Sequence, residues 1–151
     1  MRRLLYILPL LTVIVAVAQC GLLEFGIMIQ RVTGNNAFRY AFYGCHCGLG
    51  GYGRPKDDID WCCHRHDCCF DVMSAEGCKP MSILYDFDIT NGNVTCDILS
   101  NSYCARQVCE CDREAALCFK QNNHKYSKKH AIYLKHLKCK GLVPECSNYV
   151  F

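Results

Sequence analysis

The first twenty residues contain an apolar run that differs from the rest of the chain. Met1-Arg2-Arg3 is basic, and the fifteen residues 4–18 are apolar apart from one proline and one threonine. This run is short for a membrane span and is typical of a signal peptide cut after Cys20. An uncleaved anchor and a lipoprotein acylated at Cys20 are the alternatives. We expect a signal peptide over 1–20 and one secreted domain over 21–151.

The mature chain begins with a segment of helical spacing. Apolar residues recur at Leu22, Phe25, Ile29 and Val32, and the helix is expected to end at Thr33-Gly34-Asn35-Asn36. Three further apolar residues of the segment widen this stripe. The apolar surface is either part of the core or the entrance to a site for an apolar ligand.

Two longer segments carry cysteines at helical spacing. In the stretch from Cys62 to Cys69, four cysteines surround His66 and Asp67, and as a helix it places Cys62, His66 and Cys69 near one another. The segment from Tyr103 to Lys120 repeats apolar residues and cysteines every three or four positions. It carries Asp112 next to a cysteine on the inward face, where a charge needs a partner.

Two connecting segments have other patterns. Tyr85 to Ile89 alternates apolar and polar residues, Asn91-Gly92 is a hairpin turn, and Val94 to Cys96 is expected to return as a second strand. Asn93 begins a glycosylation sequon near this turn. We read the hairpin as a lobe on a mainly α-helical protein.

The span from Tyr43 to Pro55 contains five glycines and two cysteines and is expected to be a loop. Converging main-chain carbonyls beside a carboxylate would suit calcium. A phosphate-binding loop is the alternative, but the Gly-Lys-Ser/Thr ending of a P-loop is missing.

Cysteine content and charge change this picture further. Fifteen cysteines become fourteen after cleavage, which predicts a disulfide scaffold, with metal binding as the lesser alternative. Residues 21–118 have eight Lys/Arg against thirteen Asp/Glu, whereas residues 119–151 have seven lysines against Glu145 alone. The basic tail suggests an anionic partner, although a solvated basic face is equally compatible with it.

These residues allow one hydrolytic chemistry. If the two long helices pack antiparallel, Asp112 can orient His66 as a general base for water. Asp67 and the glycine loop would then bind a calcium ion that polarises an ester carbonyl. A purely structural, disulfide-stapled helix is the competing interpretation.

Three motifs resemble the secreted phospholipase A2 family, in the group II type with a C-terminal cysteine extension. The resemblance covers residues 21 to 146. The motifs are Cys62-Cys63-x-x-His66-Asp67-x-Cys69, Cys109-x-Cys111-Asp112 with Cys118 beyond it, and Tyr43-Gly44-Cys45-x-Cys47-Gly48-x-Gly50-Gly51-x-Gly53-x-Pro55. The resemblance implies a disulfide-stapled, mainly α fold with two long antiparallel helices, an N-terminal helix, a calcium loop and a small β-hairpin.

The resemblance also implies a role for each motif residue. His66 would be the base, oriented by Asp112, with Tyr85 supporting Asp112. Asp67 and the main-chain carbonyls of His46, Gly48 and Gly50 would bind Ca²⁺, and the Gly48 amide would stabilise the oxyanion. Leu22, Phe25 and Ile29 would line the acyl-chain channel. The bridges implied are Cys45–Cys139, Cys47–Cys63, Cys62–Cys118, Cys68–Cys146, Cys69–Cys111, Cys78–Cys104 and Cys96–Cys109.

The chain departs from the family pattern at Phe70, where a tyrosine usually donates to the aspartate of the dyad. The loss of that hydrogen bond is expected to affect stability and tuning rather than chemistry. His64 is expected on the surface, and no role is evident for residues 147–151.

The resemblance favours calcium-dependent hydrolysis of the sn-2 ester of glycerophospholipids at membrane interfaces, releasing fatty acid and lysophospholipid. The expected partner is an anionic phospholipid surface rather than nucleic acid, and a monomer is favoured. The alternatives are a non-enzymatic binding protein on the same scaffold and an antibacterial protein acting by charge alone. The presence of His66, Asp67 and Asp112 favours the enzyme.

Overall fold

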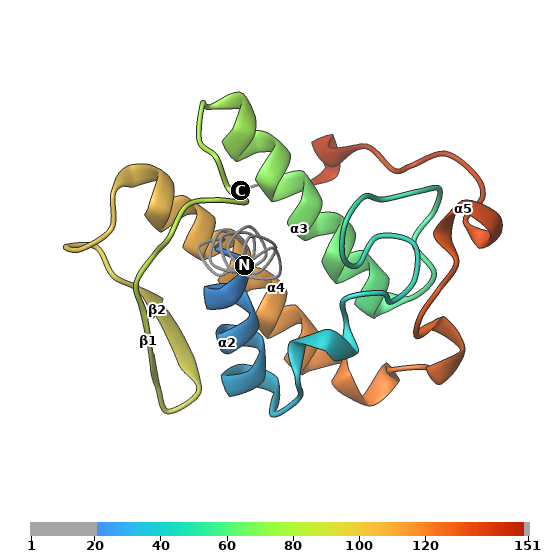
Figure 1. Cartoon of the computed structure of the whole chain (residues 1–151), viewed down its shortest axis with the longest axis horizontal. Helices are drawn as coiled ribbons and strands as arrows, with labels where there is room; N and C mark the ends of the chain where they lie inside the picture. The colour runs from blue at the N-terminus through green and yellow to red at the C-terminus, as the bar shows by residue number, and fades with distance from the viewer. Residues whose placement is uncertain (1–20, 150–151) are drawn as a thin grey trace, which may run out of the picture.

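The computed structural model describes residues 21–149, so the signal peptide expected over 1–20 lies outside the described residues. Within that range the protein is mainly helical (Figure 1). Its helices and strands are α2 (Leu22–Thr33), α3 (Asp58–Ala75), β1 (Phe87–Thr90), β2 (Asn93–Cys96), α4 (Tyr103–Asn122) and α5 (Lys135–Lys138). Short 3₁₀ turns lie at Ala37–Arg39, Asn123–Lys125, Lys128–His130 and Cys146–Asn148.

The helices begin and end where the local sequence provides caps. The Asp57 side chain accepts a hydrogen bond from the Asp60 amide at the start of α3, and Ser102 does the same for the Ala105 amide at the start of α4. Gly34 adopts the left-handed conformation after α2, and its amide donates to the carbonyl of Gln30. Both long helices therefore start at a side chain that satisfies one of the free amides of the first turn.

Helices α3 and α4 lie side by side and antiparallel, and α2 packs against α4 (Figure 1). The stripe of α2 is divided between two environments. Met28, Ile29 and Val32 are buried in the core, whereas Leu22 is 49% exposed. The carboxyl end of α2 is thus core, and its amino end presents apolar side chains to solvent.

The β-hairpin forms the small lobe expected, but its first strand begins two residues later than predicted. Phe87 pairs with Cys96, and Asn91 and Gly92 have positive φ angles of 54° and 81° in the turn. Tyr85 is not in the strand because its side chain is directed into the core, where its hydroxyl meets Asp112. The sequon residue Asn93 is exposed at the start of β2.

All seven implied disulfide bonds are present. Two of them, Cys62–Cys118 and Cys69–Cys111, join α3 to α4. The helical pair also holds the glycine loop through Cys47–Cys63, the hairpin through Cys96–Cys109 and the C-terminal segment through Cys68–Cys146. Cys78–Cys104 connects the segment after α3 to α4, and Cys45–Cys139 connects the loop to the C-terminal segment. Within residues 21–149, no helix is long and apolar enough to cross a membrane.

The prediction that His64 lies on the surface is wrong, because its side chain is only 2% exposed. Its Nε2 donates to the carbonyl of Pro144 at 2.9 Å, and its Nδ1 is 2.9 Å from the hydroxyl of Tyr149. The Cys68–Cys146 bond brings this distant segment over α3 and covers the imidazole. Tyr149, for which the sequence suggested no role, thus helps to fasten the C-terminal segment.

A second polar cluster joins α3 to the basic tail. Asp57 Oδ2 accepts hydrogen bonds from the Tyr43 hydroxyl at 2.5 Å and from His130 Nδ1 at 2.8 Å. Burial tends to raise the pKa of Asp57, but these hydrogen bonds and that from the Asp60 amide outweigh it and lower the pKa below its ordinary value. The ionised form of Asp57 therefore stabilises the fold.

Substitution of this residue tests its contribution. Asp57→Asn should lower the free energy of unfolding by about 1–3 kcal/mol at neutral pH, because a charged acceptor is lost while the helix cap is kept. A depressed folded-state pKa contributes stability above the unfolded pKa near 4, and that stability is lost as the pH falls through the folded value. The difference between variant and wild type should therefore shrink as the pH falls from about 5 to about 2.

Guanidinium unfolding with the disulfides intact measures this difference. Asp58→Asn is the matched control, since Asp58 is 54% exposed and only pairs with Lys125 at the surface. An Asp57→Asn deficit that is the same at both ends of the pH range would contradict the assignment.

Candidate active site

His66 of α3 and Asp112 of α4 meet between the two long helices. His66 Nε2 lies 2.5 Å from Asp112 Oδ1, and Asp112 is 1% exposed. An ionised carboxylate can only accept, so Nε2 donates and Nδ1 is the ring nitrogen able to take a proton. The structure thus brings together the two residues predicted as a dyad.

Tyr85 forms a hydrogen bond with the second oxygen of the Asp112 carboxylate. Its hydroxyl donates to Asp112 Oδ2 at 2.5 Å. Burial raises the pKa of Asp112, while the hydrogen bonds from His66 and Tyr85 act in the opposite direction. Burial next to Asp112 also raises the pKa of Tyr85, so the hydroxyl remains a donor.

Two aromatic rings contact the imidazole of His66. Phe25 of α2 stacks on it with ring centroids 4.6 Å apart, and Phe70 lies at 4.3 Å. Phe70 therefore packs on the histidine instead of supplying a hydroxyl to Asp112. Of the three predicted channel residues, the structure brings Phe25 to the dyad, while Ile29 is in the core and Leu22 is partly in solvent.

The glycine loop is organised by Asp60, a residue that the sequence analysis missed. Its carboxylate is fully buried and accepts hydrogen bonds from the amides of Cys45, His46 and Lys56 at 2.7–2.8 Å. Asp60 is three and seven residues before Cys63 and Asp67, so all three share one face of α3. This spacing is the signal that could have identified it.

Two glycines of the loop adopt conformations that disfavour other residues. Gly48 and Gly50 have positive φ angles of 88° and 69°. A Cβ atom on Gly48 would also lie 1.9 Å from the carbonyl oxygen of Ala41. The loop backbone around the predicted oxyanion residue therefore requires glycine.

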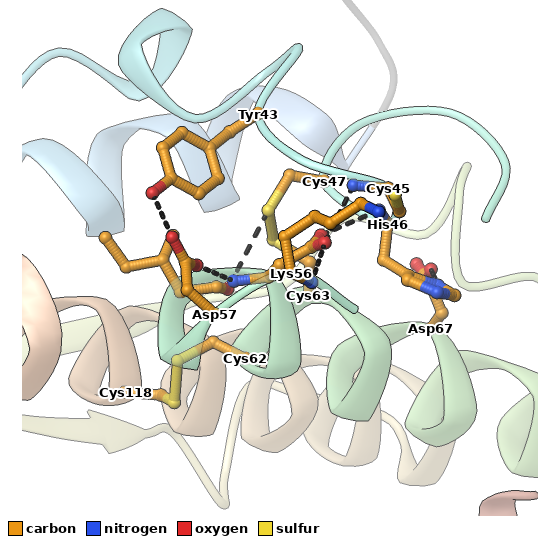
Figure 2. The surroundings of a disulfide bond; sticks show 12 residues. Tyr43, Cys45, His46, Cys47, Lys56, Asp57, Cys62, Cys63, Asp67 and Cys118 are labelled. Carbon is orange, nitrogen blue, oxygen red and sulfur yellow. Dashed lines mark hydrogen bonds and ion pairs between the residues drawn. A yellow bond between two sulfur atoms is a disulfide. The ribbon is translucent and has the colours of Figure 1, made fainter. Parts of the chain in front are cut away.

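Asp67 faces this loop from α3, about one helical turn after Cys63. The Cys47–Cys63 bond joins loop and helix, and Figure 2 shows the Asp67 carboxylate beside the His46 ring. The closest approach is 3.9 Å, between Asp67 Oδ2 and His46 Nδ1. Although 38% of the Asp67 side chain is exposed, its partial burial raises the pKa to about 7. A nearby cation would stabilise the carboxylate.

The main-chain carbonyls of the loop do converge on a cation, although it comes from the protein itself. The Lys135 ammonium donates to the carbonyls of Cys47, Leu49 and Gly50 at 2.7, 3.3 and 2.8 Å. Carbonyl oxygens with an adjacent carboxylate are the donors that calcium prefers. The residues present thus fit a hard cation, and Gly50 belongs both to the predicted ligands and to the Lys135 contacts.

Comparisons with known proteins point to one family. The phospholipase A2 family model matches residues 22–131. A group IID secretory phospholipase A2 of Mus musculus is 44% identical over 95% of this chain and 99% of its own length. A group IIE secretory phospholipase A2 of Mus musculus is 45% identical, covering 92% and 96%.

A further relative is described as a phospholipase A2 homolog rather than as a secretory phospholipase A2. A basic phospholipase A2 homolog of Vipera renardi is 45% identical over 88% of this chain and 96% of its own length. The family match and the near-complete coverage of the relatives leave one assignment. The chain belongs to the phospholipase A2 family.

Proposed function

We propose that this protein is a secreted, calcium-dependent phospholipase A2 that hydrolyses the sn-2 ester of glycerophospholipids at membrane surfaces. The observation that carries the proposal is the His66–Asp112 contact. It supports a base whose proton-accepting nitrogen is Nδ1 and whose orientation is maintained by a buried carboxylate. The products would be a fatty acid and a lysophospholipid.

His66 performs the proton transfers in this proposal. Nδ1 takes a proton from the attacking water, and Asp112 stabilises the imidazolium through Nε2–H. The same proton then passes to the departing alkoxide of the lysophospholipid. Phe25 and Phe70 shield the imidazole from bulk water.

The glycine loop stabilises the charge that develops on the ester oxygen. The amide of Gly48 is the proposed donor to that oxygen. Asp67 and the carbonyls of His46, Gly48 and Gly50 are the proposed calcium ligands. Bound calcium would supply positive charge for the ester carbonyl and for the phosphate of the substrate.

The surface around α2 suits a lipid interface. Leu22, Leu23 and Ile27 are exposed on the helix that also supplies Phe25 to the dyad. The basic tail adds lysines, each contributing about 1 kcal/mol near an anionic membrane. We therefore propose that anionic phospholipid surfaces are preferred.

The disulfide bonds support action outside the cell. Seven bonds require an oxidising compartment, and the two mouse relatives are described as secretory. The apolar run over 4–18 fits the same route.

The proposed base and metal can be tested together. Fatty-acid release from vesicles of anionic phospholipid should require calcium and should stop in excess chelator. His66→Gln should lower kcat at least about 100-fold, since a general base typically contributes that much.

His124→Gln is the matched control, because His124 is an exposed histidine of the tail. Release by folded His66→Gln at the wild-type rate, or equal release in calcium and in chelator, would contradict the proposal.

The support of Asp112 by Tyr85 can be tested separately. Tyr85→Phe should lower the free energy of unfolding by about 1–3 kcal/mol and reduce kcat, because a buried carboxylate loses a donor. Phe70→Tyr in the same chain should recover part of both losses by supplying the hydroxyl that the family usually has. Chemical unfolding and initial rates measure these effects. The assignment is wrong if Tyr85→Phe behaves as wild type.

A further inference from the structure

Lys135 stands apart from the other lysines of this protein. Every other lysine within residues 21–149 is exposed, whereas Lys135 is partly buried. Its ammonium reaches the loop and donates to three main-chain carbonyls, those of Cys47, Leu49 and Gly50. Three donors thus meet three acceptors, so the contact uses the full hydrogen-bonding capacity of the ammonium.

The backbone around Lys135 is fastened to the loop on both sides. Before Lys135, the Tyr133 amide donates to the carbonyl of Phe42, next to the loop, at 2.8 Å. After Lys135, the Cys45–Cys139 bond joins the end of α5 to the loop, and the Arg54 amide donates to the carbonyl of Lys140 at 3.0 Å. The lysine is therefore delivered to the carbonyls by a covalently attached segment rather than by a mobile tail.

The ammonium and a calcium ion would compete for the same loop. Gly50 supplies its carbonyl to Lys135 at 2.8 Å and is also a proposed calcium ligand. Calcium–oxygen distances are about 2.3–2.6 Å, so two cations sharing this oxygen would lie within about 5.4 Å of each other. Repulsion between the two cations makes occupancy by both unfavourable, and the single charge of Asp67, which also acts on Lys135, can neutralise only one of them.

We propose that Lys135 is a resident cation of the glycine loop, and that calcium binds by displacing its ammonium. This inference rests on the proposed calcium site. In the absence of calcium the lysine holds the loop carbonyls together, and its displacement sets the calcium concentration at which the enzyme works. The C-terminal segment thereby tunes the metal affinity of a site formed by distant residues.

Calcium titration of the refolded chain by calorimetry tests this directly. Lys135→Met should bind calcium about tenfold more tightly than wild type, because the competing cation and its charge-assisted hydrogen bonds are removed. Lys138→Met is the matched control, since Lys138 lies on the same short helix and is exposed. It should bind calcium as the wild type does.

Nuclear magnetic resonance of ¹⁵N,¹³C-lysine-labelled wild type gives a second readout that does not depend on activity. The Lys135 ammonium signal should shift on addition of calcium to that of a solvated lysine. If all three chains bind calcium equally and this signal does not move, the displacement is wrong while the calcium site stands. If neither wild type nor Lys135→Met binds calcium, the calcium site and the displacement both fall.

Discussion

The cross-linked pair of antiparallel helices is the constraint on which the rest of the structure depends. The Cys62–Cys118 and Cys69–Cys111 bonds join α3 to α4 on either side of His66 along the chain. Asp112 directly follows one of these cysteines, so the bond that fixes the helices also fixes the dyad. A contact of 2.5 Å between groups 46 residues apart needs such support, because small sliding of either helix would separate them.

The acidic residues of α3, together with Asp57 at its N-cap, fasten other segments to the helical pair. Asp57 fastens Tyr43 and the tail, and Asp60 binds three amides of the glycine loop. Asp67 faces the same loop and carries the charge that would attract a cation. One helix thus positions the base, the loop and the carboxylate of the proposed metal site. The basic tail contacts the same loop through Lys135, which donates to the carbonyls of Cys47 and Gly50.

Features that depend on local sequence patterns could be predicted, whereas those that depend on contacts between distant segments mostly could not. Helical spacing identified the segments around His66 and Asp112, and the antiparallel packing that their meeting required is present. The seven bridges were implied by the family resemblance alone, because cysteine spacing permits many connectivities. Within the hairpin, alternation placed Tyr85 in a strand, whereas its buried hydrogen bond to Asp112 directs it inward.

The errors and omissions involve residues whose environment is built by distant segments. His64 was expected on the surface, but Pro144 and Tyr149, some eighty residues later, bury it. In the sequence, Lys135 cannot be distinguished from the other lysines of the tail. In the structure, the Cys45–Cys139 bond holds its segment at the loop. Asp60 could have been found from its spacing to Cys63, but only its burial shows that it organises the loop.

The orientation of the His66 imidazole is the central claim, and ¹⁵N nuclear magnetic resonance of the histidine rings tests it most directly. In the neutral ring the proton should reside on Nε2, with a strongly deshielded Nε2–H resonance that disappears in Asp112→Asn. Nδ1 should show the shift of an unprotonated nitrogen. A proton on Nδ1, or an Nε2–H resonance that does not respond to Asp112, would contradict the account.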